Sequence, residues 1–463
     1  MRTYLSSLQA IRKETDKLAR FFKLVKNEYI KVFRKLSTKI MIALIILAAF
    51  ALSGIALIGK MSMENYSDDM YGSDTEDYQS NIDWLEKTQP EGYELEVAMW
   101  QYLIDNDIAW EDWRYGVLMT MFSDAGAGSD ISNVIEYLDN NDWRGYCEYM
   151  LANGNLAEGD RWEYQYRVDN DVSFDKSNKK KNDIIEKVND AKTSLAALGE
   201  GGQSENGEGR AKLEDTVSVG LYQLDNNKLD NAASAPSLFD TAEADEVNFW
   251  SVFLQSTSLI TVVALLVIVV AGGTVSSEFS QGTVKFLLIN PVKRWKILVS
   301  KYFTAITVGY IMLAILFVAM IPITGLMHGF DGFFTPYIYI SGGEVKELPT
   351  LLYAARQYLL GSVEMVVMST LAFAISSLVR STALAIGVSV FAMCVGSTVT
   401  LLLNQLGQDW ARFLVFANTD LVTIAQGNSM FAQHSLTFAV CVLAAHMVVF
   451  LLTAWDGFTK RSV

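Results

Sequence analysis

The sequence has little cysteine and histidine, and this scarcity excludes several classes of function. Only three cysteines occur in 463 residues, and Cys147 alone lies between residues 61 and 248, so this segment cannot form an internal disulfide. The histidines are also three, and they are scattered without metal-ligand spacing: His328, His434 and His446. No nucleophile motif accompanies them. We therefore expect no metal site on this chain and no enzyme activity of the chain by itself.

A complete ATP-binding loop is also missing. Residues 54–60 have the glycines and the lysine of a phosphate-binding loop, but Met61 stands where Ser or Thr would bind Mg²⁺. This match ends an apolar run and follows no strand, and the glycine-rich residues 200–209 have the composition of a flexible linker. We expect no cofactor on this chain, so any ATP and Mg²⁺ must be bound by a separate ATPase.

Acidic and apolar residues occupy different parts of the chain. The net charge is −15, although 51% of the residues are hydrophobic. Residues 61–248 hold 41 acidic and 14 basic side chains, a net charge of −27, and the remainder holds 11 acidic and 23 basic ones. An acidic, polar insert therefore interrupts a basic, apolar protein.

Six apolar runs are each long enough to cross about 30 Å of hydrocarbon as a helix. They lie near residues 40–59, 250–275, 303–326, 357–378, 382–403 and 436–455. These runs predict an all-α polytopic membrane protein with six transmembrane helices and a large, mainly helical insert between the first two. We divide the chain into a leader (1–39), span one (40–60), the acidic insert (61–248) and spans two to six (249–463).

Lysine and arginine set the expected orientation. Eleven of them lie in residues 1–39 and five in residues 276–301, and more occur between spans four and five and after span six. With six alternating spans, all four segments fall on one side, which the positive-inside rule assigns to the cytoplasm. We therefore expect a multi-pass plasma-membrane protein with cytoplasmic termini and an extracellular insert.

The leader contains a basic amphipathic pattern. Apolar residues recur every three or four positions, at Phe22, Val25, Tyr29, Phe33 and Leu36, and most lysines and arginines lie off this stripe. The pattern predicts a helix that lies along the lipid surface and contacts a cytoplasmic partner, and its basic side chains favour anionic lipid. The simpler alternative is a basic anchor beside span one.

The insert repeats a short phrase that is typical of helix ends. Its aspartate falls at Asp105, Asp139, Asp169 and Asp225, and each is followed by asparagine. Such side chains satisfy backbone groups at turns, so we expect helical hairpins with these residues at the turns. Calcium binding is a weaker alternative, because the glycine and final glutamate of a calcium loop are absent. Six tryptophans predict core packing or, alternatively, a surface for a cationic or amphipathic substrate: Trp84, Trp100, Trp110, Trp113, Trp143 and Trp162.

Glu364 lies well inside the fourth apolar run. An intramembrane carboxylate predicts a structural pair, for instance with Arg356, or a shallow position in the membrane, or alternatively a role in the transport path.

Three segments resemble the permease subunits of bacterial ABC-2 type (type II) ATP-binding-cassette exporters. The leader segment LVKNEYIKVFRK resembles their elbow helix, with Asn27, Glu28 and Lys31 at the familiar spacing. The segment SSEFSQGTVKFLLINPVKRWKILVSK (276–301) is similar to their cytoplasmic coupling segment, and the tail AWDGFTKRSV to their usual ending, although Ser462 replaces a common acidic residue. The resemblance covers span one with its leader and about 250–463.

This resemblance implies a transport mechanism. Two permease subunits, identical or paralogous, would pair in the lipid membrane above two cytoplasmic ABC ATPases, and nucleic acid would have no part in it. The resemblance assigns ATPase coupling to six residues: Glu278, Gly282, Thr283, Lys285, Pro291 and Arg294. Glu278 near the start of the coupling helix suits the helix dipole, and Pro291 would end it.

The resemblance implies ATP-driven export but does not identify the substrate, for which an antimicrobial peptide, a drug and a lipid-like compound are the candidates. The rival interpretation is a non-transporting membrane sensor or scaffold whose extracellular domain binds a ligand. A second rival is an ion exporter of the same permease family, in which the large insert would have no obvious task.

Overall fold

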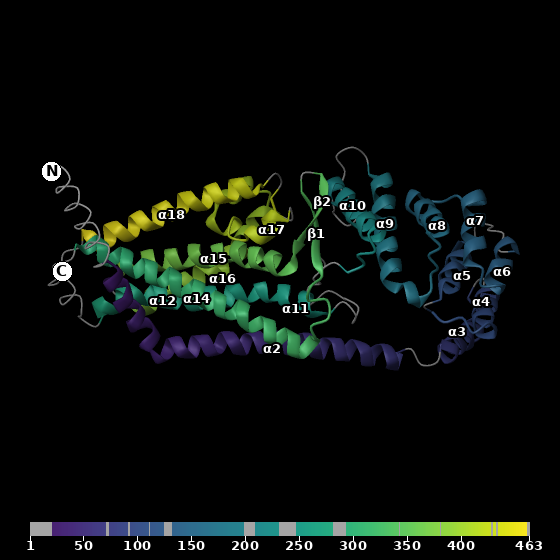
Figure 1. The fold of residues 1–463 in the computed structure, drawn as a ribbon, viewed down its shortest axis with the longest axis horizontal. Coiled ribbons are helices and arrows are strands. Elements are labelled where there is room, and N and C mark those ends of the chain that lie inside the picture. Colours follow the sequence, from purple (N-terminus) through teal and green to yellow (C-terminus); the bar gives the residue numbers. More distant parts are fainter. Residues whose placement is uncertain are drawn as a thin grey trace, which may run out of the picture. The chain divides into compact units, whose positions relative to one another are not determined.

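The computed structural model describes most of the chain and divides it into two compact units (Figure 1). The described residues are 21–70, 74–90, 93–110, 112–124, 132–198, 209–230, 247–280, 293–341, 343–379, 381–426, 429–431 and 434–460. The first unit comprises Met1–Ile58, Ala235–Phe333 and Leu351–Val463, and the second comprises Gly59–Ser234 and Phe334–Thr350.

The six expected spans are confirmed as helices of sufficient length and hydropathy to cross a membrane. They begin with α2 (Leu36–Met70), which is preceded by the helical residues 21–34. Span two combines α11 (Phe249–Gln255), the 3-10 turn η4 (Ser256–Ser258) and α12 (Leu259–Ser280). The others are α14 (Arg294–His328), α15 (Thr350–Leu378), α16 (Thr382–Gln405) and α18 (Leu436–Thr459). The chain is therefore an all-α polytopic membrane protein.

The first unit is built around α12. This helix packs against α14 and α16, and α14 also packs against α18. Burial differs among the spans: 56% of the apolar window of α15 is buried within the chain, against 17% for α16 and 11% for α18. Between α16 and α18 lie the short elements η5 (Asp409–Phe413), η6 (Val415–Ala417) and α17 (Leu421–Ala425).

The second unit is mainly helical, as expected of the insert. It contains α3 (Asp74–Thr88), α4 (Tyr93–Asp105), α5 (Trp113–Asp124), α6 (Ser132–Asp139), α7 (Trp143–Asn153), α8 (Glu158–Asn170), η2 (Lys176–Asn178), α9 (Lys179–Ala197) and α10 (Arg210–Asp225). Neighbouring helices pack in hairpins around two apolar cores. Leu103, Leu138 and Cys147 are fully buried in one core, and Ile185 and Val188 in the other.

The repeated phrase forms a repeated helix end. At each copy one residue adopts the left-handed conformation, with φ between 49° and 53°: Asp107, Asn141, Asp171 and Asn227. The asparagine just before it donates to the carbonyl four residues back, for example Asn106 to Tyr102 at 2.9 Å. Equivalent bonds form at Asn140, Asn170 and Asn226. Short polar side chains therefore close these helices because they tolerate the left-handed conformation and bond locally.

Other side chains of this phrase form hydrogen bonds with one another. Gln101 and Gln165 donate to Asp105 and Asp169, each at 2.9 Å. Among the described residues, no three His, Cys, Asp or Glu side chains gather as a metal site would require. The geometry thus explains the phrase as helix termination.

Most of the tryptophans are core residues. Trp100, Trp113 and Trp143 pack against one core of the second unit and Trp162 against the other. Trp84 is the most open of the six and is 60% exposed. Most of these side chains therefore pack against the cores and do not form a continuous tryptophan-lined surface.

A β-hairpin between α14 and α15 belongs to the second unit. Strand β1 (Pro336–Ser341) pairs antiparallel with β2 (Glu344–Pro349), with Tyr339 opposite Lys346. Glu347 on β2 accepts a hydrogen bond from Tyr222 of α10 at 3.0 Å and also pairs with Lys228. No local pattern in the sequence indicated this association of the hairpin with α10, so it is a finding of the structure.

Candidate functional site

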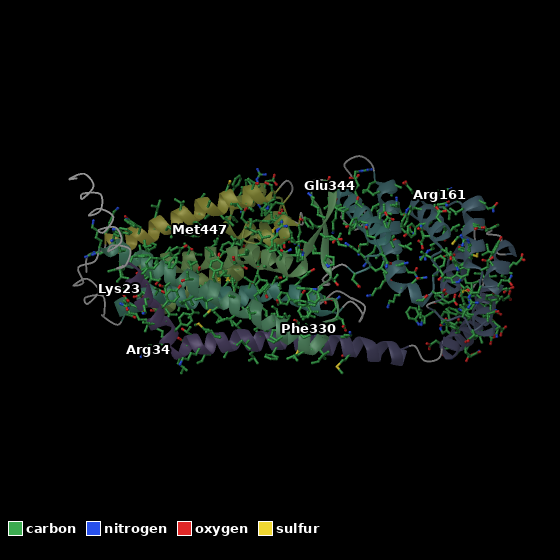
Figure 2. All side chains as sticks on the ribbon, in the orientation of Figure 1. Lys23, Arg34, Arg161, Phe330, Glu344 and Met447 are labelled. Carbon is green, nitrogen blue, oxygen red and sulfur yellow. The ribbon has the colours of Figure 1, made fainter. Side chains whose placement is uncertain are left out.

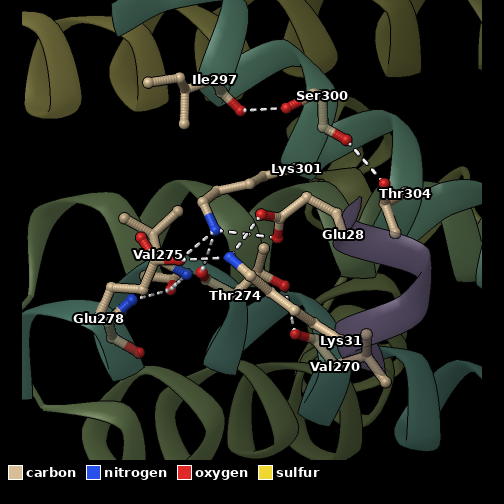
Figure 3. A network of polar contacts seen from close by, with 12 residues as sticks. Glu28, Lys31, Val270, Thr274, Val275, Glu278, Ile297, Ser300, Lys301 and Thr304 are labelled. Carbon is tan, nitrogen blue, oxygen red and sulfur yellow. Dashed lines mark hydrogen bonds and ion pairs between the residues drawn. The ribbon is translucent and has the colours of Figure 1, made fainter. Parts of the chain in front are cut away.

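Three segments that are distant in the sequence converge on a cluster of four charged side chains in the first unit (Figure 3). Glu28 and Lys31 come from the helix of residues 21–34, Glu278 from the last turns of α12, and Lys301 from the first turns of α14. We call Glu28, Lys31, Glu278 and Lys301 the four-charge cluster.

Lys301 is at the centre of the cluster. Its Nζ lies 2.6 Å from Glu278 Oε1 and 3.0 Å from Glu28 Oε2. The same ammonium donates to the carbonyl oxygen of Thr274 at 3.3 Å, so three oxygens surround it. Lys31 closes the cluster, with its Nζ 2.9 Å from Glu28 Oε1 and 3.6 Å from Glu278 Oε1.

Burial makes these contacts energetically important. The side chain of Lys301 is only 1% exposed, and those of Glu28 and Glu278 are 14% and 15% exposed. Removing an ion of this kind from water costs several kcal/mol, which close pairing and hydrogen bonding must offset. Because two ammonium groups face two carboxylates, the cluster has no net charge.

The pKa values of the leader residues fit this pairing. Burial alone would raise the pKa of Glu28, but attraction and hydrogen bonds from Lys301 and Lys31 outweigh it, so the pKa is lowered. For Lys31, burial would lower the pKa, but Glu28 and Glu278 raise it above its ordinary value. Both groups are thus held in their charged forms.

We call the helix of residues 21–34 the leader helix. It reaches the cluster by packing one face against the rest of the first unit. Val25 is buried, and the Tyr29 hydroxyl donates to Thr307 of α14. Thr38 bonds across the bend that follows this helix, with Oγ1 2.7 Å from the Val32 carbonyl oxygen. The expected apolar stripe is therefore divided: part of it faces protein, whereas Phe22 is 60% exposed.

The C-terminal end of α12 also forms hydrogen bonds with neighbouring helices. Ser376 of α15 accepts from the backbone N–H groups of Val275 and Ser276, at 3.3 and 3.0 Å. The Ser276 hydroxyl donates to Thr382 of α16 at 3.1 Å. The segment that carries Glu278 thus bonds to spans four and five just before the four-charge cluster.

The structure brings some predicted site residues together and separates others. Glu28, Lys31 and Glu278 share the cluster, whereas Asn27 is exposed beside it. Arg294 lies at the start of α14 and donates to the Thr459 carbonyl at the end of α18, at 3.5 Å. Four predicted coupling residues lie outside the described residues: Gly282, Thr283, Lys285 and Pro291.

Lys301 has no separate role predicted from the sequence. The only signal was a lysine two positions before an apolar run, which is usual for a basic flank. Its burial depends on α14 beginning at Arg294, so that Lys301 lies in the third turn of a packed helix.

Glu364 lies apart from this cluster. It is half-buried on α15, and the Thr261 hydroxyl of α12 donates to its Oε2 at 3.3 Å. Within the described chain, Arg356 forms no ion pair with it, so the suggested pairing of these two is not formed.

Residues 227–463, about half of the chain, match the family model described as "Protein of unknown function (DUF2705)". The chain belongs to this family. Two curated relatives from Bacillus subtilis (strain 168) are similar to it. "Uncharacterized protein YhcI" is 31% identical over 252 residues, which cover 54% of this chain and 76% of the relative. "Uncharacterized membrane protein YdbK" is 34% identical over 227 residues, which cover 48% of this chain and 86% of the relative. No solved structure matches.

The DUF2705 match includes only part of the four-charge cluster. Glu278 and Lys301 fall inside residues 227–463, as does Glu364, whereas Glu28 and Lys31 precede them. Nearly all of the acidic insert also lies before the matched region. The membrane part from α11 to α18 is therefore what defines this chain as a DUF2705 protein.

Proposed function

We propose that this protein is the membrane-spanning permease subunit of an ABC-2 type ATP-binding-cassette exporter. In this proposal a separate cytoplasmic ATPase binds the ATP and Mg²⁺, and a second permease copy or paralogue completes the transporter. The Lys and Arg bias supports plasma-membrane insertion with cytoplasmic termini and an extracellular insert. The observation that carries the proposal is the four-charge cluster.

The cluster suits the transmission of movement from a docked ATPase. Glu278 and Lys301 lie near the two ends of the coupling segment (276–301), Glu278 at the end of α12 and Lys301 in α14. Their direct contact at 2.6 Å fixes the spacing of α12 and α14, and both groups also bond to the leader helix. A displacement of the segment would therefore act on three helices at once, including the leader that continues into α2.

The substrate proposal rests on charge and on Glu364. A net charge of −27 in residues 61–248 attracts cations from the outer surface. A carboxylate inside a span is costly unless it faces protein, water or a ligand, and among the described residues Glu364 accepts a single long hydrogen bond, from Thr261. Both features favour a cationic amphipathic substrate, such as an antimicrobial peptide, over a neutral drug or lipid-like compound.

Co-purification tests the proposal. The tagged full-length chain is extracted from its native membrane in mild detergent, and the proteins that accompany it are identified and quantified. We expect a stoichiometric ABC ATPase, its loss in Lys285→Glu, and its retention in Lys187→Glu, which makes the same change on the exposed surface of the insert. A well-folded chain without any ATPase would reject the transporter and favour the sensor or scaffold.

A second measurement separates docking from coupling. In liposomes that contain permease and ATPase, Lys301→Gln should retain the bound ATPase but lose substrate-stimulated ATP hydrolysis, because the spacing of α12 and α14 is no longer fixed. Lys296→Gln, an identical change five residues earlier on α14, should retain both. If the substrate stimulated ATP hydrolysis equally in the two variants, the four-charge cluster would have no part in coupling.

A further inference from the structure

The leader helix sorts its charges between two faces. Among residues 21–34 the only acidic side chain is Glu28, and it lies in the four-charge cluster together with Lys31. Lys23, Lys26 and Arg34 are exposed and, in the described part of the chain, pair with no carboxylate. Helical periodicity places these three cations around Ile30, on the face opposite Glu28. We call Lys23, Lys26, Ile30 and Arg34 the outer basic face; Figure 2 labels Lys23 and Arg34.

Among the described residues, no carboxylate balances the cations of the outer basic face, whereas Glu28 and Glu278 balance Lys31 on the opposite face. Three cations within about three turns of helix repel one another, and the single acidic group of the helix is already engaged by Lys301. Beyond the bend, Lys35 and Lys39 are exposed as well and add to the same field. No carboxylate of the described residues compensates these cations, so the outer basic face suits an anionic partner from outside the chain.

The position of this face specifies the source of those anions. A bend at Lys35 separates the helix from α2, which begins at Leu36 and is the first candidate membrane span. The cations thus lie within a few turns of the point where the chain enters the hydrocarbon. Ile30 and Phe22 are 44% and 60% exposed on the same helix, as suits the boundary between headgroups and acyl chains.

We propose that the outer basic face binds the phosphate groups of anionic phospholipids. The bound lipid would hold the outer basic face of the leader helix at the membrane surface, while the four-charge cluster holds the opposite face against the protein. This binding needs neither an ATPase nor a transported substrate, so it stands independently of the proposed function. Zwitterionic lipid, whose phosphate is balanced by its own ammonium, would bind less well.

Lipid selection by the full-length protein tests this proposal. The chain is reconstituted in phosphatidylcholine nanodiscs that contain a fixed minor fraction of phosphatidylglycerol, then washed in mild detergent, and the retained lipids are quantified by mass spectrometry. We expect retained lipid to be several-fold richer in phosphatidylglycerol than the bulk. The variant K23Q/K26Q/R34Q should lose at least about half of this enrichment, since one basic group near the surface contributes roughly five-fold in affinity.

Two controls keep the result interpretable. K87Q/K187Q/R161Q removes the same three charges from exposed positions of the insert and should keep the enrichment. K23R/K26R/R34K preserves the charge and should keep it too, which separates charge loss from misfolding. The proposal is overturned if the wild type shows no enrichment or if K23Q/K26Q/R34Q keeps it. It is also overturned if that variant loses an ATPase partner while its lipid selection is unchanged.

Discussion

At the scale of single residues, the buried ammonium group of Lys301 holds three helices together in the four-charge cluster. Lys301 is surrounded by Glu28, Glu278 and the Thr274 carbonyl, and its exposed fraction is 1%. A buried pair adds little net stability compared with an apolar replacement of both partners, but the loss of one partner leaves the other charge uncompensated. The cluster is therefore expected to respond differently to single and to combined substitutions.

Replacing Lys301 with Met should destabilise the protein strongly. Glu28 and Glu278 would lose their shared partner, so we expect a loss of about 3–5 kcal/mol in the free energy of unfolding. Thermal unfolding of the purified protein, followed by intrinsic fluorescence, measures this loss. Adding Glu278→Gln to Lys301→Met should recover part of it. Lys296→Met is the matched control on the same helix, and an equal shift in both single variants would contradict the assignment.

The lowered pKa of Glu28 predicts how its contribution depends on pH. Because the folded-state pKa is below the ordinary value of 4.5, the ionised group stabilises the fold above that value. The contribution is lost as pH falls through the folded-state pKa. We therefore expect the melting temperature of Glu28→Gln to be lower than wild type at pH 6 and to converge with it on acidification. A constant difference down to the acid limit would show that Glu28 is not held ionised by its lysine neighbours.

At the scale of elements, the insert reuses one way of ending a helix. Four helix ends place Asp or Asn in the left-handed conformation, and asparagine side chains bond back to carbonyl groups four residues earlier. These ends also carry tertiary contacts, because Tyr102 of α4 donates to Asp139 at 2.5 Å and Arg144 of α7 to Asp171 at 2.8 Å. Turn chemistry and packing therefore depend on the same residues.

A β-branched residue at one of these ends should loosen it locally. Asp107 has φ of 50°, which costs an ordinary L-residue about 1–2 kcal/mol. Asp107→Val should therefore speed hydrogen exchange in residues 101–108 by roughly 5- to 30-fold, measured on the full-length protein by mass spectrometry. Asp107→Gly should show no such increase, because glycine adopts this conformation freely. Asp190→Val, within α9, controls for the change in charge; equally fast exchange in the glycine variant would refute the conformational cause.

At the scale of the whole molecule, the chain is two compact units joined through continuous segments. The division assigns Phe334–Thr350 to the unit of the insert, although this stretch separates α14 from α15. The insert is thus attached to the spans by α2, by the chain before α11, and by both ends of the hairpin. Any deletion intended to remove the insert has to account for the hairpin as well.

The predicted topology can be tested with single cysteines. Cys147 is buried and its pKa is raised to about 12 by that burial, so it should not react, and Cys394 and Cys441 are replaced by alanine. Asp190→Cys should be labelled by an impermeant maleimide in intact cells. Lys460→Cys should be labelled only after the membrane is opened. The reverse pattern would invert the proposed orientation.

Removal of the insert should leave ATPase binding intact. In a chain that lacks residues 62–247 and has 336–349 replaced by a short linker, the proposed docking segment and the four-charge cluster remain. We expect the ATPase to co-purify as with wild type, while protection against a cationic peptide substrate is lost. Deletion of 62–247 alone leaves Glu347 without Tyr222 and Lys228, so it should give less stable protein. Unchanged protection would separate the insert from substrate handling.

The sequence by itself determined the membrane character, the six spans and the helical insert. Apolar runs of about 20 residues can satisfy their backbone only as helices in hydrocarbon, so composition and length suffice. The helix ends at the Asp–Asn phrase could also be predicted, because a few neighbouring residues decide where a helix ends. Glu28, Lys31 and Glu278 were singled out by the resemblance to exporter permeases, but neither the resemblance nor a local pattern could show that they meet.

Only the tertiary structure decided which charges are paired and where the hairpin belongs. Lys301 is 273 residues from Glu28 in the sequence, and its burial follows from the packing of three helices. The same packing buries Val25 against protein, although the apolar stripe alone predicted that it faces lipid, and it leaves Lys23, Lys26 and Arg34 exposed. The hairpin joins α10 through contacts between residues far apart in the chain, such as Tyr222 with Glu347, which are separated by 125 positions. Long-range contacts of this kind depend on the closure of large loops, which local sequence does not encode.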